Sequence, residues 1–280
     1  MCIRDRILNA DATVMDCVFR GNTAEQLGGA LYCSTYVSGQ IVNCTFAGNS
    51  SDEGGAVATS YMNSVGLRNC TFVANSADQR GGAVSSGGGE SILSLTNCTL
   101  TANDAPLGGA IYRSSGDVLL ANCIVWSNTP APIAGENVSA VFSCIEGGWE
   151  GEGNIDADPL FVDAAGADDV FGTADDDLHL QAASPCVNAG DNKPLHGVLE
   201  TDFEGDLRVQ HCRSDMGVDE TPYYRDENDN GVADACEGWA RGVIYVDGNA
   251  TGGLGDGSSW DDAYLELREA LSQAERTGEV

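Results

Sequence analysis

Basic side chains are scarce in this sequence. A single lysine, Lys193, stands among 13 basic residues, against 43 acidic ones, so the formal net charge is −30 at pH 7. A surface this acidic repels phosphate backbones and anionic lipid headgroups, which argues against nucleic acid and membrane surfaces as partners. The same charge favours divalent cations as partners. It also keeps an extracellular or salt-adapted protein soluble, and the sequence leaves both explanations open.

Long apolar runs are also lacking. No stretch approaches the roughly 20 apolar residues of a membrane span. The first residues, Met-Cys-Ile-Arg-Asp-Arg, lack the apolar core of a secretion signal. A repeat begins almost at once, and the last residues resemble the opening of another unit. We therefore expect the chain to be a piece of a longer protein.

Helical spacing of apolar residues is absent from the first half, which instead repeats a motif of roughly 26 residues. The segment Asn43-Cys-Thr-Phe-Ala-Gly-Asn49 recurs as Asn69-Cys-Thr-Phe-Val-Ala-Asn75 and as Asn97-Cys-Thr-Leu-Thr-Ala-Asn103. A Gly-Gly-Ala segment such as Gly54-Gly-Ala-Val57 follows each copy. Self-similarity of this length predicts a solenoid of stacked coils.

Apolar and polar residues alternate on both sides of the repeated cysteine, as half-buried strands require. The alternation changes parity at the Asn-Cys pair, which indicates a bend there. We predict inward-facing core positions before the cysteine at Val14, Ile41, Leu67, Leu95, Leu120 and Val141, and after it at Phe19, Phe46, Phe72, Leu100 and Val125.

Repeated asparagines and glycines have structural explanations. Asparagine tolerates tight turns, and stacked asparagines bond to one another, while paired glycines permit close backbone approach. We predict one asparagine ladder of Asn43, Asn69, Asn97 and Asn122, and a second of Asn22, Asn49, Asn75, Asn103 and Asn128.

The N-C-T-F and G-G-A pattern resembles the β-helical repeats of chlamydial-type polymorphic outer-membrane proteins and related bacterial surface proteins. The resemblance implies an all-β fold, a right-handed parallel β-helix, over residues 7–145. This architecture carries adhesins, stalks and carbohydrate-active enzymes alike, so it does not select a function.

Cysteines recur at one position of the repeat. Side chains on adjacent coils stand about 4.8 Å apart, which is wider than the roughly 3.8 Å between Cβ atoms in a disulfide. We interpret them as a stack of buried thiols that fill the core, with disulfides or a metal as the alternatives. Cys186 and Cys212 are better disulfide candidates, given an extracellular location. The stack comprises Cys17, Cys44, Cys70, Cys98, Cys123 and Cys144.

After the last of these cysteines the repeat decays. Four segments then follow in an order that resembles the closing region of secreted, anchor-associated bacterial β-helix proteins. They are Asp156-Ala-Asp-Pro-Leu-Phe161, Ser184-Pro-Cys-Val-Asn-Ala-Gly-Asp191, Asp202-Phe-Glu-Gly-Asp-Leu-Arg208 and Asp215-Met-Gly-Val-Asp-Glu220. Because a β-helix exposes a sheet edge at its end, we assign residues 146–222 to terminal coils and a cap.

Residues 223–240 contain an acidic loop that matches the calcium-loop pattern D-x-[DN]-x-[DN]-G-x5-E. It resembles the isolated dockerin-like or thrombospondin-type loops of extracellular proteins, and Ca²⁺ is the cofactor it predicts. The alternative is an acidic interdomain linker. The predicted metal ligands are Asp226, Asn228, Asn230, Val232 through its carbonyl, Asp234 and Glu237.

Residues 241–280 resemble the N-terminal opening of a second, truncated β-helix. Gly242-Val-Ile-Tyr-Val-Asp247 predicts a strand, and Ser259-Trp-Asp-Asp262 predicts the start of a helix.

Other titratable residues give weaker signals. Glu25, Asp52 and Asp78 each follow a repeated cysteine by eight residues, so they form either a cation-binding stripe or three solvated turn carboxylates. The three histidines, His179, His196 and His211, lack metal-binding spacing in the sequence, and we interpret them as ordinary cap or surface residues.

We expect a secreted or cell-surface, calcium-stabilised module for adhesion, glycan contact or spacing, with a polysaccharide or cell-surface ligand as its partner. The repeated coils show neither the paired carboxylates of a glycosidase nor the base of a lyase. The alternative function is a polysaccharide lyase or glycoside hydrolase, with its active site in acidic loops or in coils beyond this sequence.

Overall fold

The computed structural model describes residues 5–7, 11–61, 63–193, 201–209 and 213–222. These residues lie within one compact unit, Met1–Tyr224. Every regular element among them is a β-strand. No helix in this part of the chain is long and apolar enough to cross a membrane. The predicted calcium loop and the segment 241–280 lie outside the described residues.

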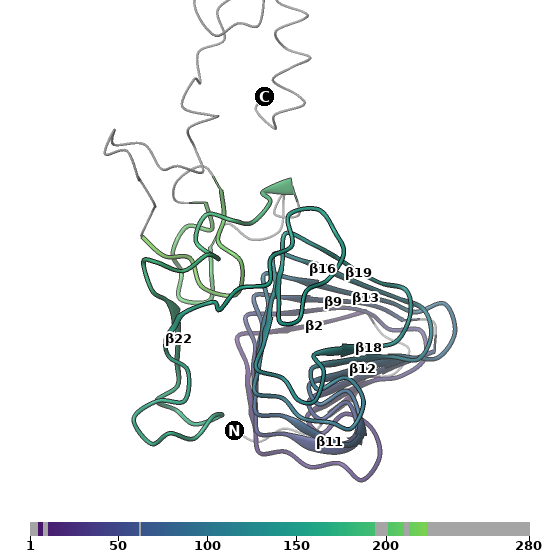
Figure 1. Ribbon diagram of the computed structural model, residues 1–280. Helices are drawn as coiled ribbons and strands as arrows, with labels where there is room; N and C mark the ends of the chain where they lie inside the picture. The colour runs from purple at the N-terminus through teal and green to yellow at the C-terminus, as the bar shows by residue number, and fades with distance from the viewer. Residues whose placement is uncertain (1–4, 8–10, 62, 194–200, 210–212, 223–280) are drawn as a thin grey trace, which may run out of the picture. The chain divides into compact units, whose positions relative to one another are not determined.

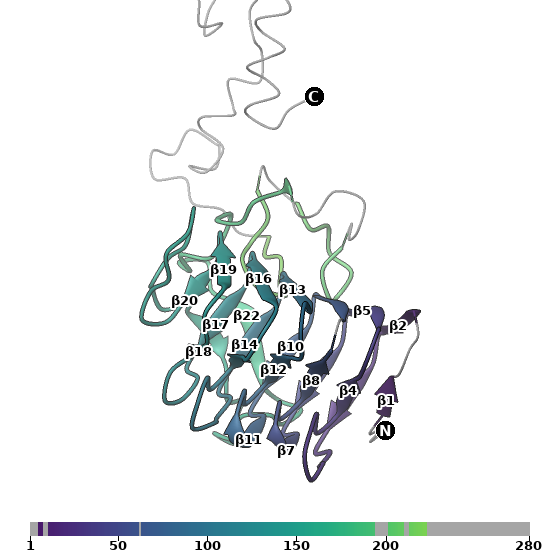
Figure 2. The same ribbon diagram turned by 90° about the vertical axis from the view of Figure 1, so that its right-hand side faces the viewer.

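The described residues wind into an all-β parallel solenoid that contains three six-stranded sheets. Figure 1 looks nearly down the axis along which the coils stack, and Figure 2 shows the strands of successive coils side by side. Sheet A contains β1 (Asp5–Ile7), β4 (Leu31–Cys33), β8 (Val57–Ser60), β12 (Val84–Gly87), β15 (Ile111–Arg113) and β18 (Ile133–Ala134). We call β1 to β20 the coil stack.

The other two large sheets flank the repeated cysteine. Sheet B contains β2 (Asp11–Met15), β5 (Ser38–Val42), β9 (Ser64–Arg68), β13 (Ile92–Thr96), β16 (Asp117–Ala121) and β19 (Val138–Val141). Sheet C contains β3 (Val18–Arg20), β6 (Thr45–Ala47), β10 (Thr71–Val73), β14 (Thr99–Thr101), β17 (Ile124–Trp126) and β20 (Cys144–Ile145). A short sheet pairs β7 (Ser50–Glu53) with β11 (Ser76–Arg80).

The predicted bend lies between sheets B and C. Asp16, Asn43, Asn69, Asn97 and Asn122 have φ angles of 53°, 52°, 49°, 50° and 54°. Asparagine and aspartate visit this left-handed region more readily than most residues. The bend reverses which alternate side chains face the core, and this explains the change of parity in the sequence.

Aromatic rings form the centre of the core. The rings of Phe19, Phe46 and Phe72 stack along the coil axis, with centroids 4.9 and 4.8 Å apart and planes only 4° from parallel. Leu100 and Val125 continue the same row, because their strands pair in register. Apolar burial of this kind supplies the main stabilisation of each coil.

One predicted core residue is wrong. Leu120 pairs with Ala140 in the last coil, and Val141 pairs with Ala121. Val141 is therefore on the outer face and 36% exposed, whereas Ala140 is 2% exposed. The sequence-based register took Cys144 as the repeated cysteine of the last coil. In the structure that coil is one residue shorter than this register requires, so every position counted back from Cys144 falls one residue too late.

The predicted ladder that begins at Asn22 is confirmed. Asn49 Nδ2 donates to Asn75 Oδ1 at 2.9 Å, and Asn75 Nδ2 donates to Asn103 Oδ1 at 2.9 Å. Asn22 and Asn128 extend the row at its two ends. Each amide carbonyl also accepts the backbone N–H of the preceding asparagine in the row, so the buried amides satisfy one another.

The other predicted ladder is wrong for most of its length. Asn122 Nδ2 lies 3.4 Å from Asn97 Oδ1. However, Asn69 Nδ2 donates to the carbonyl of Thr201, and Asn97 Nδ2 donates to that of Asp215. The left-handed backbone turns these side chains away from the core, so they bond to a later segment that covers them.

We call that later segment, residues 146–222, the cap. Residues up to Ile155 close the end of the coil stack, where Ile155 N–H donates to Ser143 O at 3.0 Å. Later described residues of the cap lie against the outer face of sheet C, where Arg20 donates to the Thr173 carbonyl and the Val218 N–H donates to Thr99 Oγ1. Val18, Thr99 and Ile124 occupy the same outward-facing position in different coils of sheet C. Val18, in an early coil, is 52% exposed, whereas Thr99 and Ile124, in later coils, are each 1% exposed. The cap therefore covers the later coils.

Candidate functional site

An acidic groove lies where the cap meets sheet C. The cap strands β21 (Phe161–Asp163) and β22 (Asp177–Leu180) pair antiparallel, and Figure 1 shows β22 beside the coil stack. Two adjoining pockets of about 490 and 420 Å³ lie beside β22. Asp177, His179 and Glu204 line both of them, and we call the two pockets together the groove.

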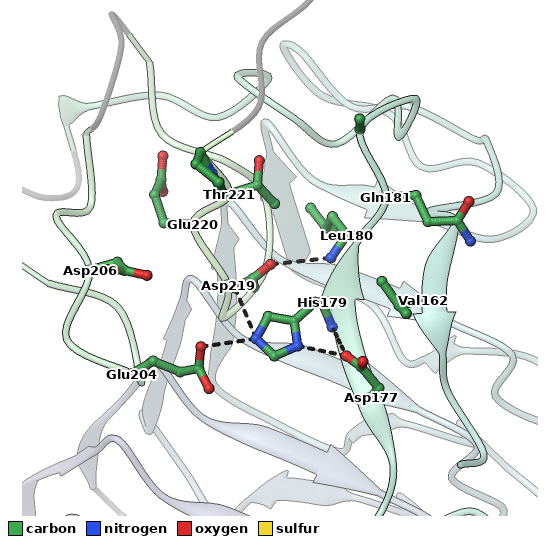
Figure 3. Close-up of a pocket in the computed structure, with 12 residues that line it drawn as sticks. Val162, Asp177, His179, Leu180, Gln181, Glu204, Asp206, Asp219, Glu220 and Thr221 are labelled. Atoms are coloured by element: carbon green, nitrogen blue, oxygen red, sulfur yellow. Dashed lines mark hydrogen bonds and ion pairs between the residues drawn. The ribbon is translucent and has the colours of Figure 1, made fainter. Parts of the chain in front are cut away.

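His179 has a carboxylate at each ring nitrogen (Figure 3). Its Nδ1 lies 2.6 Å from Asp177 Oδ1, and its Nε2 lies 2.9 Å from Glu204 Oε2 and 3.9 Å from Asp219 Oδ1. Partial burial by itself lowers the His179 pKa. The hydrogen bonds to Glu204 and Asp177 and the charge of Asp219 outweigh it and raise the pKa to about 9. In the absence of any other cation, the imidazole is therefore protonated at neutral pH.

Phe203 contributes an exposed aromatic ring to the groove. This ring is 40% exposed, lines the second pocket and lies 6.1 Å from the His179 ring, centroid to centroid. An exposed aromatic ring beside charged groups offers a flat apolar surface with hydrogen-bonding partners at its edge.

Arg208 connects the cap loops of the groove to the coil stack. Its side chain is 1% exposed, and it donates to Asn69 Oδ1 at 2.7 Å and to the Val218 carbonyl at 2.8 Å. Its Nη1 lies 3.5 Å from Glu220 Oε2. Burial lowers the pKa of Arg208 although the surrounding carboxylates oppose the shift. The guanidinium thus joins two cap segments to a turn of the coil stack.

Two other acids of the cap motifs shape its loops. Asp202 Oδ1 accepts the backbone N–H groups of residues 204, 205 and 206, each at 2.9 Å. Asp215 Oδ1 accepts the Asn188 N–H at 2.6 Å, and its Oδ2 accepts the Thr221 N–H at 2.8 Å. Both carboxylates are buried. The D-x-x-G-x-x-R and D-x-G segments therefore position the loops that carry Glu204 and Asp219.

Burial also acts on the acids near Arg208. It raises the pKa of Asp215 to about 6 and, together with the charge of Asp215, raises that of Glu220 to about 9. It raises the pKa of Asp219 as well. The charged form of each carboxylate is costly where water is excluded, and a nearby cation offsets that cost.

Four of the six repeated cysteines are buried thiols in one row, as predicted. Cys44, Cys70, Cys98 and Cys123 are buried and free, and burial raises the pKa of the last three. The first member of the row, Cys17, is free and half-buried.

Cys144 does not belong to this row. It pairs with Ile124, which lies one position after Cys123. Ser143 occupies the cysteine position instead, and its hydroxyl accepts the Cys123 N–H at 3.0 Å. Cys144 faces the cap, where it packs in a cluster with Cys186 and Met216. Cys186 is a buried free thiol, and its proposed partner Cys212 lies outside the described residues.

The remaining predicted sites have different outcomes. Glu25 and Asp78 are exposed, and Asp52 is half-exposed and accepts a hydrogen bond from Gln79 at 3.2 Å. Asp52 and Asp78 lie on the short strands β7 and β11 rather than in turns, and the exposure of all three residues is that of solvated carboxylates. The ligands predicted for Ca²⁺, together with His196 and His211, lie outside the described residues, so they stay predictions.

From the sequence we interpreted His179 as an ordinary cap or surface residue, and this interpretation did not predict the three carboxylates around its ring. Glu204 is 25 residues away in the sequence, and Asp219 is further still, so no short motif connects them. One local signal was present. Asp177 and His179 alternate on a strand, which places both side chains on one face.

Residues 6–142 match the family model described as "Right handed beta helix region". The coil stack is a right-handed parallel β-helix. No curated protein matches the chain. The matched residues end before the cap, so the match describes the scaffold and not the groove.

Proposed function

We propose that this chain is part of a secreted or cell-surface module that binds a glycan without cleaving it, and that the β-helix serves as its rigid spacer. The observation that carries the proposal is the open groove with Phe203 exposed beside His179 and its carboxylates. The C–H face of a sugar ring stacks on an aromatic ring, while its hydroxyls bond to neighbouring polar groups.

The charge of the groove limits the class of glycan. Asp175, Asp176, Asp177 and Glu204 line the pocket that contains Phe203. Their negative charge repels polyuronates and sulfated chains and attracts amino sugars. We therefore expect neutral or amino-sugar polysaccharides as ligands.

Binding is tested by affinity electrophoresis and calorimetry with soluble neutral, amino-sugar and anionic polysaccharides. Phe203→Ala is expected to weaken binding by about tenfold, since the lost stacking is worth about 1.4 kcal/mol. Phe171→Ala is the matched control, because Phe171 is a similarly exposed cap phenylalanine (37% against 40%) that lies outside both pockets. Equal losses in the two variants, or binding to anionic chains alone, would contradict the proposal.

A glycoside hydrolase or polysaccharide lyase is the second candidate. It is favoured by the several carboxylates in the groove, one of which, Asp219, has a raised pKa as a general acid requires. Incubation with the same polysaccharides separates the two candidates. New reducing ends would indicate a hydrolase, and unsaturated products would indicate a lyase. We expect neither product.

Calcium stabilisation is the part of the proposal that rests on sequence alone. The loop Asp226–Glu237 supplies oxygen ligands at the spacing that Ca²⁺ loops use. Calcium titration of the full chain is expected to show a site that Asp226→Ala with Glu237→Ala removes. Unchanged affinity in that double variant would leave an acidic linker as the explanation.

A further inference from the structure

Three side chains from separate cap segments converge in the groove. One ligand atom from each of His179, Glu204 and Asp219 lies within 4.8 Å of the other two. His179 Nε2 is 2.9 Å from Glu204 Oε2 and 3.9 Å from Asp219 Oδ1. Two ligands of a tetrahedral zinc ion stand about 3.4 Å apart when each bond is about 2.1 Å long. The observed separations lie on both sides of that value, so small side-chain movements would complete the geometry.

The orientation of His179 is already fixed. Asp177 Oδ1 accepts both the Nδ1–H of the ring, at 2.6 Å, and the backbone N–H of His179, at 3.1 Å. This leaves Nε2 directed toward Glu204 and Asp219, as Figure 3 shows. A carboxylate behind the ring is the usual support of a metal-binding histidine, since it sets the tautomer and increases the basicity of the other nitrogen.

Asp219 provides an independent observation. Its side chain is only 5% exposed. Its Oδ2 accepts the Leu180 N–H at 3.1 Å, but among the described residues no donor hydrogen-bonds to its Oδ1, whose nearest charged partner is His179 Nε2 at 3.9 Å. A charge on a side chain that is this well shielded from water is costly unless a cation lies beside it. A cation bound between Asp219 and His179 would remove that cost.

We propose that His179 Nε2, Glu204 Oε2 and Asp219 Oδ1 bind a divalent transition-metal ion of the Zn²⁺ class, with Asp177 as the positioning residue. The imidazole nitrogen selects against Ca²⁺ and Mg²⁺, which prefer oxygen ligands. The remaining coordination position faces the 490 Å³ pocket, which all three ligands line. The ion would join β22 to the loops around residues 204 and 219.

This proposal does not depend on glycan binding, because the metal is measured without any polysaccharide. The competing explanation is a protonated histidine held between carboxylates. That cluster has the same contacts but no affinity for a metal. Zn²⁺ could also bind to the predicted calcium loop or to the cysteines. Excess Ca²⁺ saturates the calcium loop, and thiolate bands in the Co²⁺ spectrum would reveal binding to cysteines.

The test is calorimetric titration of the full chain with Zn²⁺ in excess Ca²⁺, together with the absorption spectrum of the Co²⁺-substituted protein. We expect one saturable site and a Co²⁺ spectrum without thiolate charge-transfer bands. The isosteric change Asp219→Asn and the change His179→Gln are expected to weaken Zn²⁺ binding by roughly 100-fold. Asp177→Asn is expected to weaken it by roughly tenfold.

Asp206→Asn is the matched control, since Asp206 lines the same pocket without belonging to the ligand cluster. It is expected to bind Zn²⁺ as the unchanged chain does. Near-ultraviolet circular dichroism shows whether each variant is folded. Three outcomes would overturn the proposal: no saturable binding, equal affinity in folded Asp219→Asn and Asp206→Asn, or a Co²⁺ spectrum dominated by thiolate.

Discussion

In the asparagine row that begins at Asn22, each buried side chain bonds to the same residue type on the next coil, whereas in the cap Arg208 bonds to groups of other types from distant segments. Asn75 Nδ2 donates to Asn103 Oδ1 at 2.9 Å, in a row of five asparagines. Arg208 instead bonds to Asn69 and to the Val218 carbonyl and lies beside Glu220. The asparagine row is thus stabilised by one hydrogen bond repeated from coil to coil, whereas the cap is stabilised by contacts that each occur once.

This difference has a functional consequence. Each asparagine of the row has nearly the same surroundings, so no position in the row differs chemically from the others. The side-chain oxygens and amides are already used in hydrogen bonds to neighbouring coils. The cap gathers unlike groups around His179 and leaves Asp219 Oδ1 without a donor among the described residues. Chemistry that needs unlike groups close together is therefore expected in the cap.

The largest expected effect comes from removing Arg208. Arg208→Met deletes the donor to Asn69 Oδ1 and to the Val218 and Gly217 carbonyls, which are buried. Each buried acceptor left without its donor costs about 1–3 kcal/mol, so we expect a total loss of about 3–5 kcal/mol. Hydrogen exchange is expected to show that the cap loses protection while sheet A keeps it.

Arg113→Met is the matched control, because Arg113 bonds only to the nearby Gly116 carbonyl among the described residues. Its effect on the free energy of unfolding is expected to be below about 1 kcal/mol. Simultaneous loss of protection in the cap and the coil stack of Arg208→Met would show that the two regions are not separately stabilised.

The next effect is in the asparagine row. Asn75→Ala removes the acceptor of both the backbone N–H and the side-chain amide of Asn49. Leaving buried donors unpaired is expected to lower the free energy of unfolding by about 3 kcal/mol, measured by urea titration.

Asn43→Gly provides the comparison within the repeat. Asn43 Nδ2 donates to Asp16 at an exposed site, and glycine accepts the φ of 52° without strain. We expect a change below about 1 kcal/mol. Equal losses in Asn75→Ala and Asn43→Gly would refute the distinction between the internal row and the outward-facing asparagines.

A smaller effect is expected from the thiols. Cys98→Ala removes one buried, unreactive sulfur and is expected to cost about 1 kcal/mol. A thiol-reactive dye should label Cys98 only after unfolding. A loss above about 3 kcal/mol, or a mass that shows a disulfide at Cys98, would mean that the thiol row is more than core filling.

Repetition also decided what could be predicted from the sequence. The coils, the bend at the asparagines and the stacked phenylalanines were predictable because one register applied to every copy. The register failed at Cys144 and Val141, where the last coil is shorter and no further copy exists to correct it.

The groove could not be predicted in the same way. His179, Glu204 and Asp219 come together through the folding of three loops, and those loops depend on Arg208 and Asp202 contacts that occur once. Only the Asp177–His179 alternation was visible in the sequence. The cap motifs were recognised as a unit, but their buried acids turned out to position loops.

The most direct test of a functional cap and a structural coil stack is the affinity for a neutral or amino-sugar polysaccharide in two variants. We predict that Phe203→Ala weakens binding by about tenfold. We also predict that the triple variant Glu25→Gln, Asp52→Asn, Asp78→Asn, which neutralises solvated carboxylates of the coils, binds like the unchanged chain. Full affinity in Phe203→Ala with a loss in the triple variant would contradict the account and place the contact surface on the coils.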